Sequence, residues 1–134
     1  MTDTAIATLL EEKAIERLLL RYVALNDAAD YEALVGLFTP DGALVRPTAP
    51  NAPIEGREAI LAAMRARPPR KARHLVCNVE IEILDATRAR ARSTMVLISA
   101  TDAGKDISVG GFGDLLEKQN GAWLFRSRTG TTSI

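Results

Sequence analysis

The segment HLVCNVEIEIL, residues 74–84, alternates between apolar and polar side chains. This period of two is typical of a β-strand, in which successive side chains point to opposite faces of a sheet. One face is expected to carry Leu75, Cys77, Val79, Ile81 and Ile83, and the other His74, Val76, Asn78, Glu80 and Glu82. The second face begins with an imidazole, a valine and an amide, which suits the wall of a small cavity with polar groups.

Three further strands are predicted after this one, over residues 88–100, 105–118 and 122–131. Glycines at 110, 111 and 113 indicate a bulge or bend inside the second of them. Asn120-Gly121 is a strong signal for a hairpin turn before the last strand. The second half of the chain is therefore predicted to form an antiparallel sheet.

The first half of the chain has helical periodicity. Ile15, Leu18, Leu19 and Tyr22 recur at spacings of three and four, in a helix that begins near Asp3 or at the Thr8 capping position. A second helix is expected after Asp30 and through Phe38, and a third over residues 55–67, which Pro68 and Pro69 end. Between them we expect a short strand over 43–46 and a proline-rich loop over 47–53. Three helices followed by antiparallel strands define an α+β domain.

Composition is that of an ordinary globular protein with a single domain, residues 1–134. The formal net charge is zero, which argues against binding to nucleic acid or to an anionic membrane surface. The lone cysteine, Cys77, excludes an internal disulfide, and the N-terminus lacks the pattern of a signal peptide. We therefore expect a cytoplasmic protein.

Two polar residues are candidates for chemistry. Asp27 extends a largely apolar side of the first helix, and His74, the only histidine, opens the strand described above. The alternative for each is a solvated surface residue, because Asp is mostly exposed in proteins. No metal-ligand spacing is present, and the glycines at 110–113 open no helix as a dinucleotide site would require. The basic segment RARPPRKAR, residues 65–73, is interpreted as a solvated connector.

Four segments together resemble the SnoaL-like branch of the NTF2-like superfamily. They are AIERLLLRYVALNDAADYEALVGLFTPDGAL (14–44), PIEGREAI (53–60), ARHLVCNVEIEI (72–83) and GAWLFRSRTG (121–130), and the likeness extends over residues 6–131. The group includes scytalone dehydratase and the hexachlorocyclohexane dehydrochlorinases. The resemblance implies an NTF2-like, cystatin-like cone, with three N-terminal helices packed on a bent antiparallel sheet that encloses a pocket.

The resemblance also implies site residues. The family's catalytic Asp–His pair matches Asp27 and His74, with Asn78 completing the pattern of His, three residues, then Asn. Arg128 matches an arginine that holds the leaving group in the dehydrochlorinases, and Tyr22 stands where those enzymes have a lysine. Tyr22, Asn78 and Arg128 are thus predicted to contact substrate. Phe38, Met95 and Phe112 are expected to shape the pocket, with Met64 and residues 47–53.

These observations predict a small-molecule lyase or isomerase that works without metal or organic cofactor. Asp27 would orient His74, and His74 would act as a general base in elimination or isomerisation of a small, largely apolar substrate. The alternative is a non-catalytic protein that binds a ligand or supports a complex, as the β subunits of ring-hydroxylating dioxygenases do. We expect a homodimer, with a trimer as the other arrangement, through the sheet face of Leu75, Cys77, Val79 and Ile81.

Overall fold

The computed structural model describes residues 2–134. The chain begins with helix α1 (Asp3–Asp27) and the short helix α2 (Tyr31–Val35), and helix α3 (Arg57–Arg65) follows strands β1 (Phe38–Arg46) and β2 (Ala49–Glu55). The remaining strands are β3 (Ala72–Ile83), β4 (Arg88–Thr101), β5 (Gly104–Gln119) and β6 (Ala122–Thr132).

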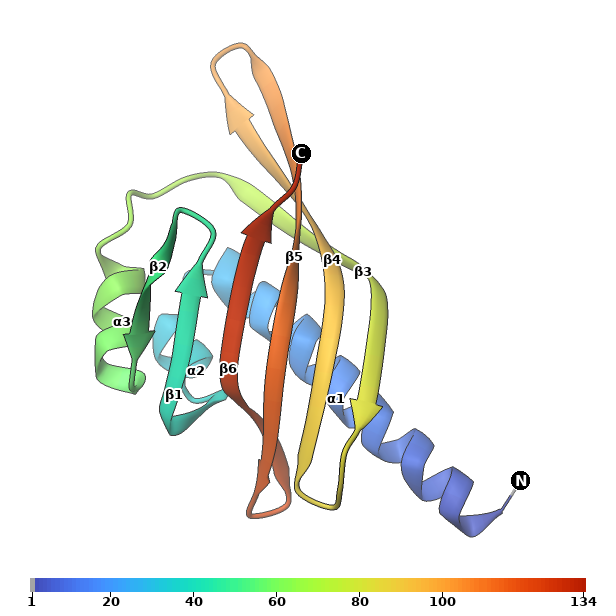
Figure 1. The fold of residues 1–134 in the computed structure, drawn as a ribbon. Helices are drawn as coiled ribbons and strands as arrows, with labels where there is room; N and C mark the ends of the chain where they lie inside the picture. The colour runs from blue at the N-terminus through green and yellow to red at the C-terminus, as the bar shows by residue number, and fades with distance from the viewer. Residues whose placement is uncertain (1) are drawn as a thin grey trace.

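The six strands form one sheet in the order β2-β1-β6-β5-β4-β3. Helix α1 crosses behind the sheet, while α2 and α3 lie at the end of the sheet where β1 and β2 are found (Figure 1). Neighbouring strands are antiparallel except β1 and β6, which run parallel. The predicted α+β class is confirmed, but the sheet is mixed where a fully antiparallel one was expected.

The hydrophobic core lies between the helices and one face of the sheet, which we call the inner face. Ile15 and Leu19 of α1, Leu34 of α2, Phe38 of β1 and Phe125 of β6 are fully buried in it. The helical spacing of Ile15 and Leu19 gives α1 the apolar stripe that covers the strands. The N-terminal turns of α1 extend past the sheet, so Leu9 and Leu10 are exposed (Figure 1).

A β-bulge in β3 overturns the predicted division of its side chains between two faces. Asn78 has φ of 51°, and the register with β4 shifts between Cys77 and Glu80. The extra residue reverses the alternation. Val79, Ile81 and Ile83 therefore pack against the core together with Val76.

Two predicted boundaries in the first half were also wrong. Residues 47–53 were expected to be a loop, but most of them belong to strand β2, which lies at the edge of the sheet. Proline is tolerated on an edge strand because one side of that strand donates no ladder hydrogen bond. Phe38 was expected to end the second helix, but that helix stops at Val35 and Phe38 starts β1.

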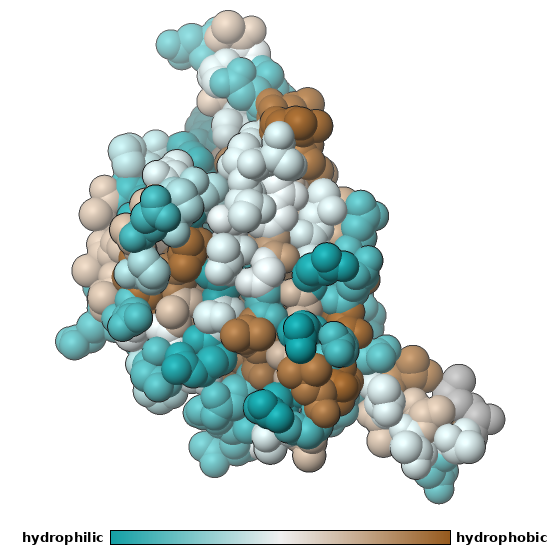
Figure 2. All heavy atoms as spheres, viewed as in Figure 1, coloured by the Kyte–Doolittle hydropathy of each residue, from teal (hydrophilic) through white to brown (hydrophobic). Residues whose placement is uncertain are grey.

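The outer face of the sheet is turned toward the viewer in Figure 1. Leu75 and Leu115 are 54% and 51% exposed, and a space-filling view shows apolar patches between hydrophilic side chains over the strands (Figure 2). The predicted interface set of Leu75, Cys77, Val79 and Ile81 is wrong as a set, because the bulge leaves only Leu75 and Cys77 exposed.

Among residues 2–134, no helix has the length and apolar character needed to cross a membrane.

Candidate functional site

The end of helix α1 and the start of strand β3 meet through Asp27 and His74. Oδ1 of Asp27 lies 2.6 Å from Nδ1 of the His74 ring, and Oδ2 accepts a hydrogen bond from the His74 backbone N–H at 2.9 Å. The side chains are 11% and 7% exposed, respectively. The carboxylate thus fixes both the position of the strand and the orientation of the ring.

This arrangement determines which ring nitrogen is available. A carboxylate is an acceptor, so Nδ1 must carry a proton to form the 2.6 Å contact. In a neutral ring the proton on Nδ1 leaves the lone pair on Nε2. Nε2 has no hydrogen-bond partner in the part of the chain that the structure describes. His74 is therefore arranged to accept a proton at Nε2.

The pair lies in the wall of a cavity of about 720 Å³ between the helices and the inner face. A cavity of this size is within the range of small-molecule sites. The apolar part of its lining includes Leu44, Met64, Met95, Leu97 and Phe112, and the polar part includes Tyr22, Asn26, Tyr31, Arg46, Arg67 and Ser108. Of the predicted pocket residues, Tyr22, Asp27, Met64, His74, Met95 and Phe112 are in this lining, as are Pro47 and Thr48.

Tyr22 is 4% exposed and stands among aromatic rings. Its ring packs edge-on against Phe38, Phe112 and Phe125 at centroid distances of 6.2, 6.0 and 5.6 Å. Burial raises the pKa of Tyr22 above its ordinary value, although the charge of Arg128 acts in the opposite direction. The phenol is consequently neutral near pH 7 and can donate a hydrogen bond into the cavity.

Arg128 is fully buried and lies behind the cavity wall. Its guanidinium carbon is 3.6 Å from the ring centroid of Phe112 and 4.2 Å from that of Tyr22, and its Nε lies 3.1 Å from Oδ1 of Asp114. Desolvation raises the pKa of Asp114 to about 6 and lowers the pKa of Arg128. Arg128 is not in the cavity lining and packs against Tyr22 and Phe112, which are, so the expectation that its guanidinium faces the cavity is corrected.

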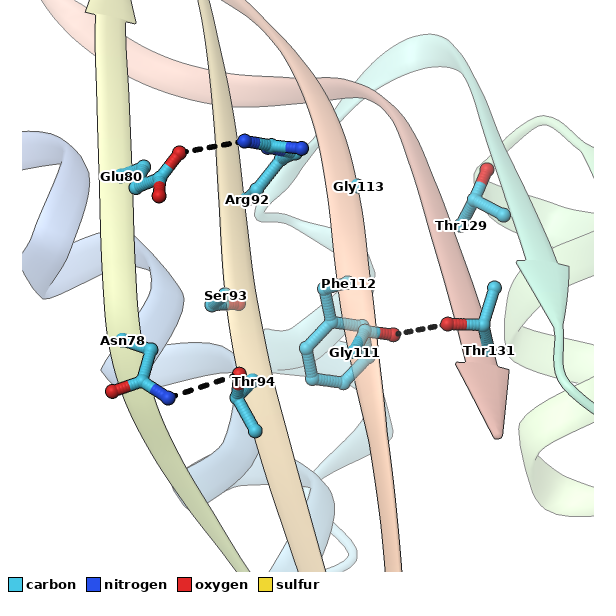
Figure 3. Close-up of a pocket in the computed structure, with 10 residues that line it drawn as sticks. All are labelled: Asn78, Glu80, Arg92, Ser93, Thr94, Gly111, Phe112, Gly113, Thr129 and Thr131. Carbon is cyan, nitrogen blue, oxygen red and sulfur yellow. Dashed lines mark hydrogen bonds and ion pairs between the residues drawn. The ribbon is translucent and has the colours of Figure 1, made fainter. Parts of the chain in front are cut away.

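Asn78 and Phe38 are also absent from the cavity lining. The bulge turns Asn78 toward the outer face, where its Nδ2 donates to Thr94 Oγ1 at 3.4 Å beside the Glu80–Arg92 ion pair (Figure 3). These residues line a shallow groove over the middle of β3, β4 and β5. Phe38 is fully buried behind Tyr22. The expectation that Asn78 and Phe38 lie in the wall of this cavity is thus corrected.

Seven polar lining residues were not predicted from the sequence: Asn26, Tyr31, Arg46, Arg67, Arg70, Ser108 and Thr132. Arg67 belongs to the basic segment 65–73 that was interpreted as solvated, yet its Nη2 donates to Asn26 Oδ1 at 2.6 Å and to the Tyr31 hydroxyl at 3.2 Å. Asn26 directly precedes Asp27, so its position at the end of α1 was an available signal. Arg46 carries no local pattern that distinguishes it from a surface residue.

The fold and this site define a class of small α+β proteins in which a helix and a curved sheet enclose a ligand-sized cavity. A family model described as "SnoaL-like domain" matches residues 7–129. The chain belongs to this SnoaL-like family. Among proteins with curated descriptions, none matches the sequence.

Several solved structures are similar over nearly the whole chain. One is a variant of Rv3472, a protein of unknown function from Mycobacterium tuberculosis, with 30% identity and a TM-score of 0.86 over 96% of this chain and 75% of that one. Another is a candidate scytalone dehydratase from Novosphingobium aromaticivorans, with 29% identity and a TM-score of 0.85 over 100% of this chain and 89% of that one.

The description of a third similar structure states its fold. It is an NTF2-like protein with a cystatin-like fold, also from Novosphingobium aromaticivorans, with 23% identity and a TM-score of 0.84 over 96% of this chain and 86% of that one. The predicted NTF2-like, cystatin-like architecture is confirmed by this likeness.

Proposed function

We propose that this protein is a small-molecule lyase or isomerase in which His74 is the general base and Asp27 orients it. The observation that carries the proposal is the 2.6 Å contact between Asp27 Oδ1 and His74 Nδ1 in the wall of a cavity of about 720 Å³. The likeness to a candidate scytalone dehydratase supports elimination of water as the reaction type.

The proposed reaction begins with a carbon acid held against His74. Nε2 takes a proton from a carbon next to a carbonyl, and the electron pair of the broken C–H bond enters a new C=C bond. In an elimination the hydroxyl on the neighbouring carbon leaves with its bonding electrons and takes up the proton now held by the His74 imidazolium, so that it departs as water and His74 is neutral again. In an isomerisation the carbonyl π electrons move to the oxygen as the C=C bond forms, and they return to the carbonyl when the imidazolium gives its proton to a different carbon. Asp27 stabilises the imidazolium in both cases.

The walls supply the rest of the catalytic effect. A general base of this kind contributes about 10²–10⁴-fold, so positioning and stabilisation of negative charge must provide more. The neutral Tyr22 phenol is a donor for an enolate-like oxygen. Leu44, Met64, Met95 and Phe112 give the substrate an apolar surface that excludes water from the reacting atoms.

Proton exchange offers a test that does not require the natural substrate. A panel of small aromatic β-hydroxy ketones and simple ketones is incubated in D₂O, and deuterium incorporation next to the carbonyl is followed by NMR. We expect the wild-type protein to accelerate exchange or dehydration of at least one compound, and His74→Gln to lose about 10²-fold or more of that rate. A rate that is unchanged in His74→Gln would exclude His74 as the base. Absence of acceleration across the panel would count against the enzyme.

The alternative is a pocket protein that binds a metabolite or supports a larger complex without catalysis. The position of Arg128 favours it, because the buried guanidinium that would hold a leaving group is not part of the cavity lining. The two functions differ in the panel experiment. A binding protein would show saturable ligand binding with the same exchange rate in wild type and His74→Gln, and mass spectrometry of the purified protein would identify a retained ligand.

A further inference from the structure

Three arginines line the cavity away from the Asp27–His74 contact: Arg46 at the end of β1, and Arg67 and Arg70 just after α3. Arg70 is exposed, whereas Arg46 and Arg67 are half-buried. The Nε of each of these two half-buried arginines is buried and has no hydrogen-bond partner among residues 2–134. Cationic groups in such positions lose part of their hydration, and the loss is offset only when an acceptor or an anion contacts them.

Neither Arg46 nor Arg67 is neutralised by the protein. Within residues 2–134, no carboxylate oxygen lies within 4.0 Å of either guanidinium, whereas six other arginines form ion pairs at up to 3.8 Å. These paired arginines are Arg65, Arg88, Arg90, Arg92, Arg126 and Arg128. Exposed arginines without an ion pair also occur, at positions 17, 21, 70 and 73, but water solvates them. Arg46 and Arg67 differ because they are half-buried in a cavity wall and still lack a carboxylate.

Neutral groups hold Arg67 in place. Its Nη2 donates to Asn26 and to the Tyr31 hydroxyl, and its guanidinium carbon lies 5.4 Å from the Tyr31 ring centroid. These contacts fix the direction of the guanidinium without cancelling its charge. Asp27 is the only acid in the cavity lining among the described residues, and both its oxygens are occupied by His74.

The two positive charges act on the interior of the cavity. Arg67 and Arg46 both lower the pKa of the Tyr22 hydroxyl, although burial raises it more. This effect places both charges within electrostatic reach of the phenol. The cavity therefore combines an apolar wall, one proton-accepting imidazole and an excess of fixed positive charge.

We infer that the cavity binds an apolar organic ligand that carries a carboxylate, and that Arg46 and Arg67 recognise this carboxylate. A planar guanidinium matches a carboxylate with paired N–H donors, which makes arginine suitable for the role. The inference extends the proposed function, because it restricts the expected largely apolar substrate to a carboxylic acid. What it implies for catalysis rests on the proposed function. Binding of the carboxylate itself requires no catalysis.

The test compares two probes of nearly the same shape, one charged and one neutral. 2-Naphthylacetate and 2-naphthylacetamide are titrated into the protein of residues 1–134, and binding is measured by calorimetry and by ¹H–¹⁵N NMR. We expect the carboxylate to bind at least about tenfold more tightly than the amide, and this preference to decrease with added salt. Equal affinities, or no binding of the carboxylate at low millimolar concentration, would overturn the inference.

Variants identify the residues responsible. Arg46→Gln and Arg67→Gln should each reduce the preference for carboxylate severalfold, while Arg90→Gln, which removes an equal charge from an exposed residue paired with Glu82, should leave it unchanged. Arg67→Lys keeps the positive charge. It is the second variant to use if Arg67→Gln fails to fold because its contact with Asn26 is disturbed. It should retain a part of the preference that Arg67→Gln loses. A preference that survives Arg46→Gln and Arg67→Gln would overturn the assignment.

His74→Gln separates this inference from the proposed function. If the carboxylate preference is present but no variant changes proton exchange, the catalytic proposal fails and the carboxylate site stands. If exchange depends on His74 but charged and neutral probes bind equally, the carboxylate site fails and the catalytic proposal stands. A naphthyl phosphate with the same ring tests the anion class, and tighter binding of the phosphate than of the carboxylate would contradict the choice of carboxylate.

Discussion

Asp27 binds His74 twice: one carboxylate oxygen accepts the ring Nδ1–H and the other accepts the backbone N–H of the same residue. The second contact joins the last residue of α1 to the third residue of β3. The orientation of the imidazole is thereby coupled to the packing of a helix against a sheet. The ring cannot rotate without losing a charge-assisted hydrogen bond in a largely dry environment.

Asp27→Asn is expected to reverse the tautomer of His74. The asparagine oxygen can accept the backbone N–H, but its NH₂ group would then face Nδ1 and favour the ring with the proton on Nε2. The ¹⁵N chemical shifts of the imidazole measure the tautomer directly. Asp102→Asn, in the exposed turn between β4 and β5, serves as the control. Identical ¹⁵N shifts in wild type and Asp27→Asn would contradict the contact.

The buried pair of Asp114 and Arg128 predicts a pH dependence of stability. The folded-state pKa of Asp114 is about 6, against an ordinary value of 3.8, because burial disfavours the charged carboxylate. Between these values the folded protein holds the proton more tightly than the unfolded chain, so the free energy of unfolding falls as the pH rises. The wild-type protein should therefore lose stability relative to Asp114→Asn between pH 3.8 and about 6.

Urea denaturation of both proteins at closely spaced pH values checks this sign. The difference in free energy of unfolding, wild type minus Asp114→Asn, should be largest near pH 4 and level off above pH 6, because these pH values lie near the unfolded and folded pKa values of Asp114. Growth of the difference with rising pH would mean that attraction to Arg128 exceeds the cost of desolvation. In that event the carboxylate would be stabilised in its charged form by the pair.

Asn78 has a structural role that a pattern of residue types did not reveal. Its φ of 51° lies in the left-handed region, which asparagine and glycine adopt more readily than β-branched residues. Asn78→Gly should keep the bulge and stay close to wild-type stability. Asn78→Val should cost about 1–3 kcal/mol in the free energy of unfolding, because a branched side chain is strained there.

Thr94→Val provides the matched control, since it removes only the 3.4 Å hydrogen bond between Asn78 and Thr94. Its effect on urea denaturation should be much smaller than that of Asn78→Val. Equal losses in the two variants would show that the side-chain contact, and not the backbone conformation, makes Asn78 important.

The sequence was sufficient for the fold class and for the Asp27–His74 pair, but for different reasons. The helical period of Ile15, Leu19 and Tyr22 is a direct consequence of burial on one side of α1. The pair came from the resemblance, because nothing in the spacing of residues 27 and 74 indicates that they meet. Proximity between residues so distant in the chain depends on how α1 lies across the sheet.

The errors share one physical origin. Alternation in residues 74–84 shows that a strand is present, but a single left-handed residue reverses the face of everything that follows it. Arg67 was misread for a related reason, since composition cannot show that a basic segment folds back over a cavity and that one of its arginines contacts Asn26. Backbone irregularities and tertiary contacts, not propensities, decide these positions.

Self-association through the outer face remains a prediction, now for a smaller set of residues. Leu75 lies in register with Val96 on the neighbouring strand, and Leu75 and Leu115 are each more than half exposed. We expect sedimentation to show a dimer, or a trimer, at micromolar concentration, and Leu75→Glu with Leu115→Glu to produce monomer. Leu10→Glu, on the exposed start of α1, is the control and should leave the oligomer intact. A wild-type monomer would contradict the prediction.

Tyr22→Phe isolates the contribution of one hydroxyl to the proposed chemistry. The ring makes edge-on contacts with Phe38, Phe112 and Phe125, and phenylalanine preserves them, so stability should change by less than about 1 kcal/mol. Loss of the donor should slow proton exchange by about 10²–10³-fold, because a charged oxygen in the cavity would lack its hydrogen bond. The exchange assay and thermal unfolding are measured on the same preparation. An unchanged exchange rate at unchanged stability would assign Tyr22 to the packing of the cavity wall alone, and the arginines would then be the remaining donors to the developing charge.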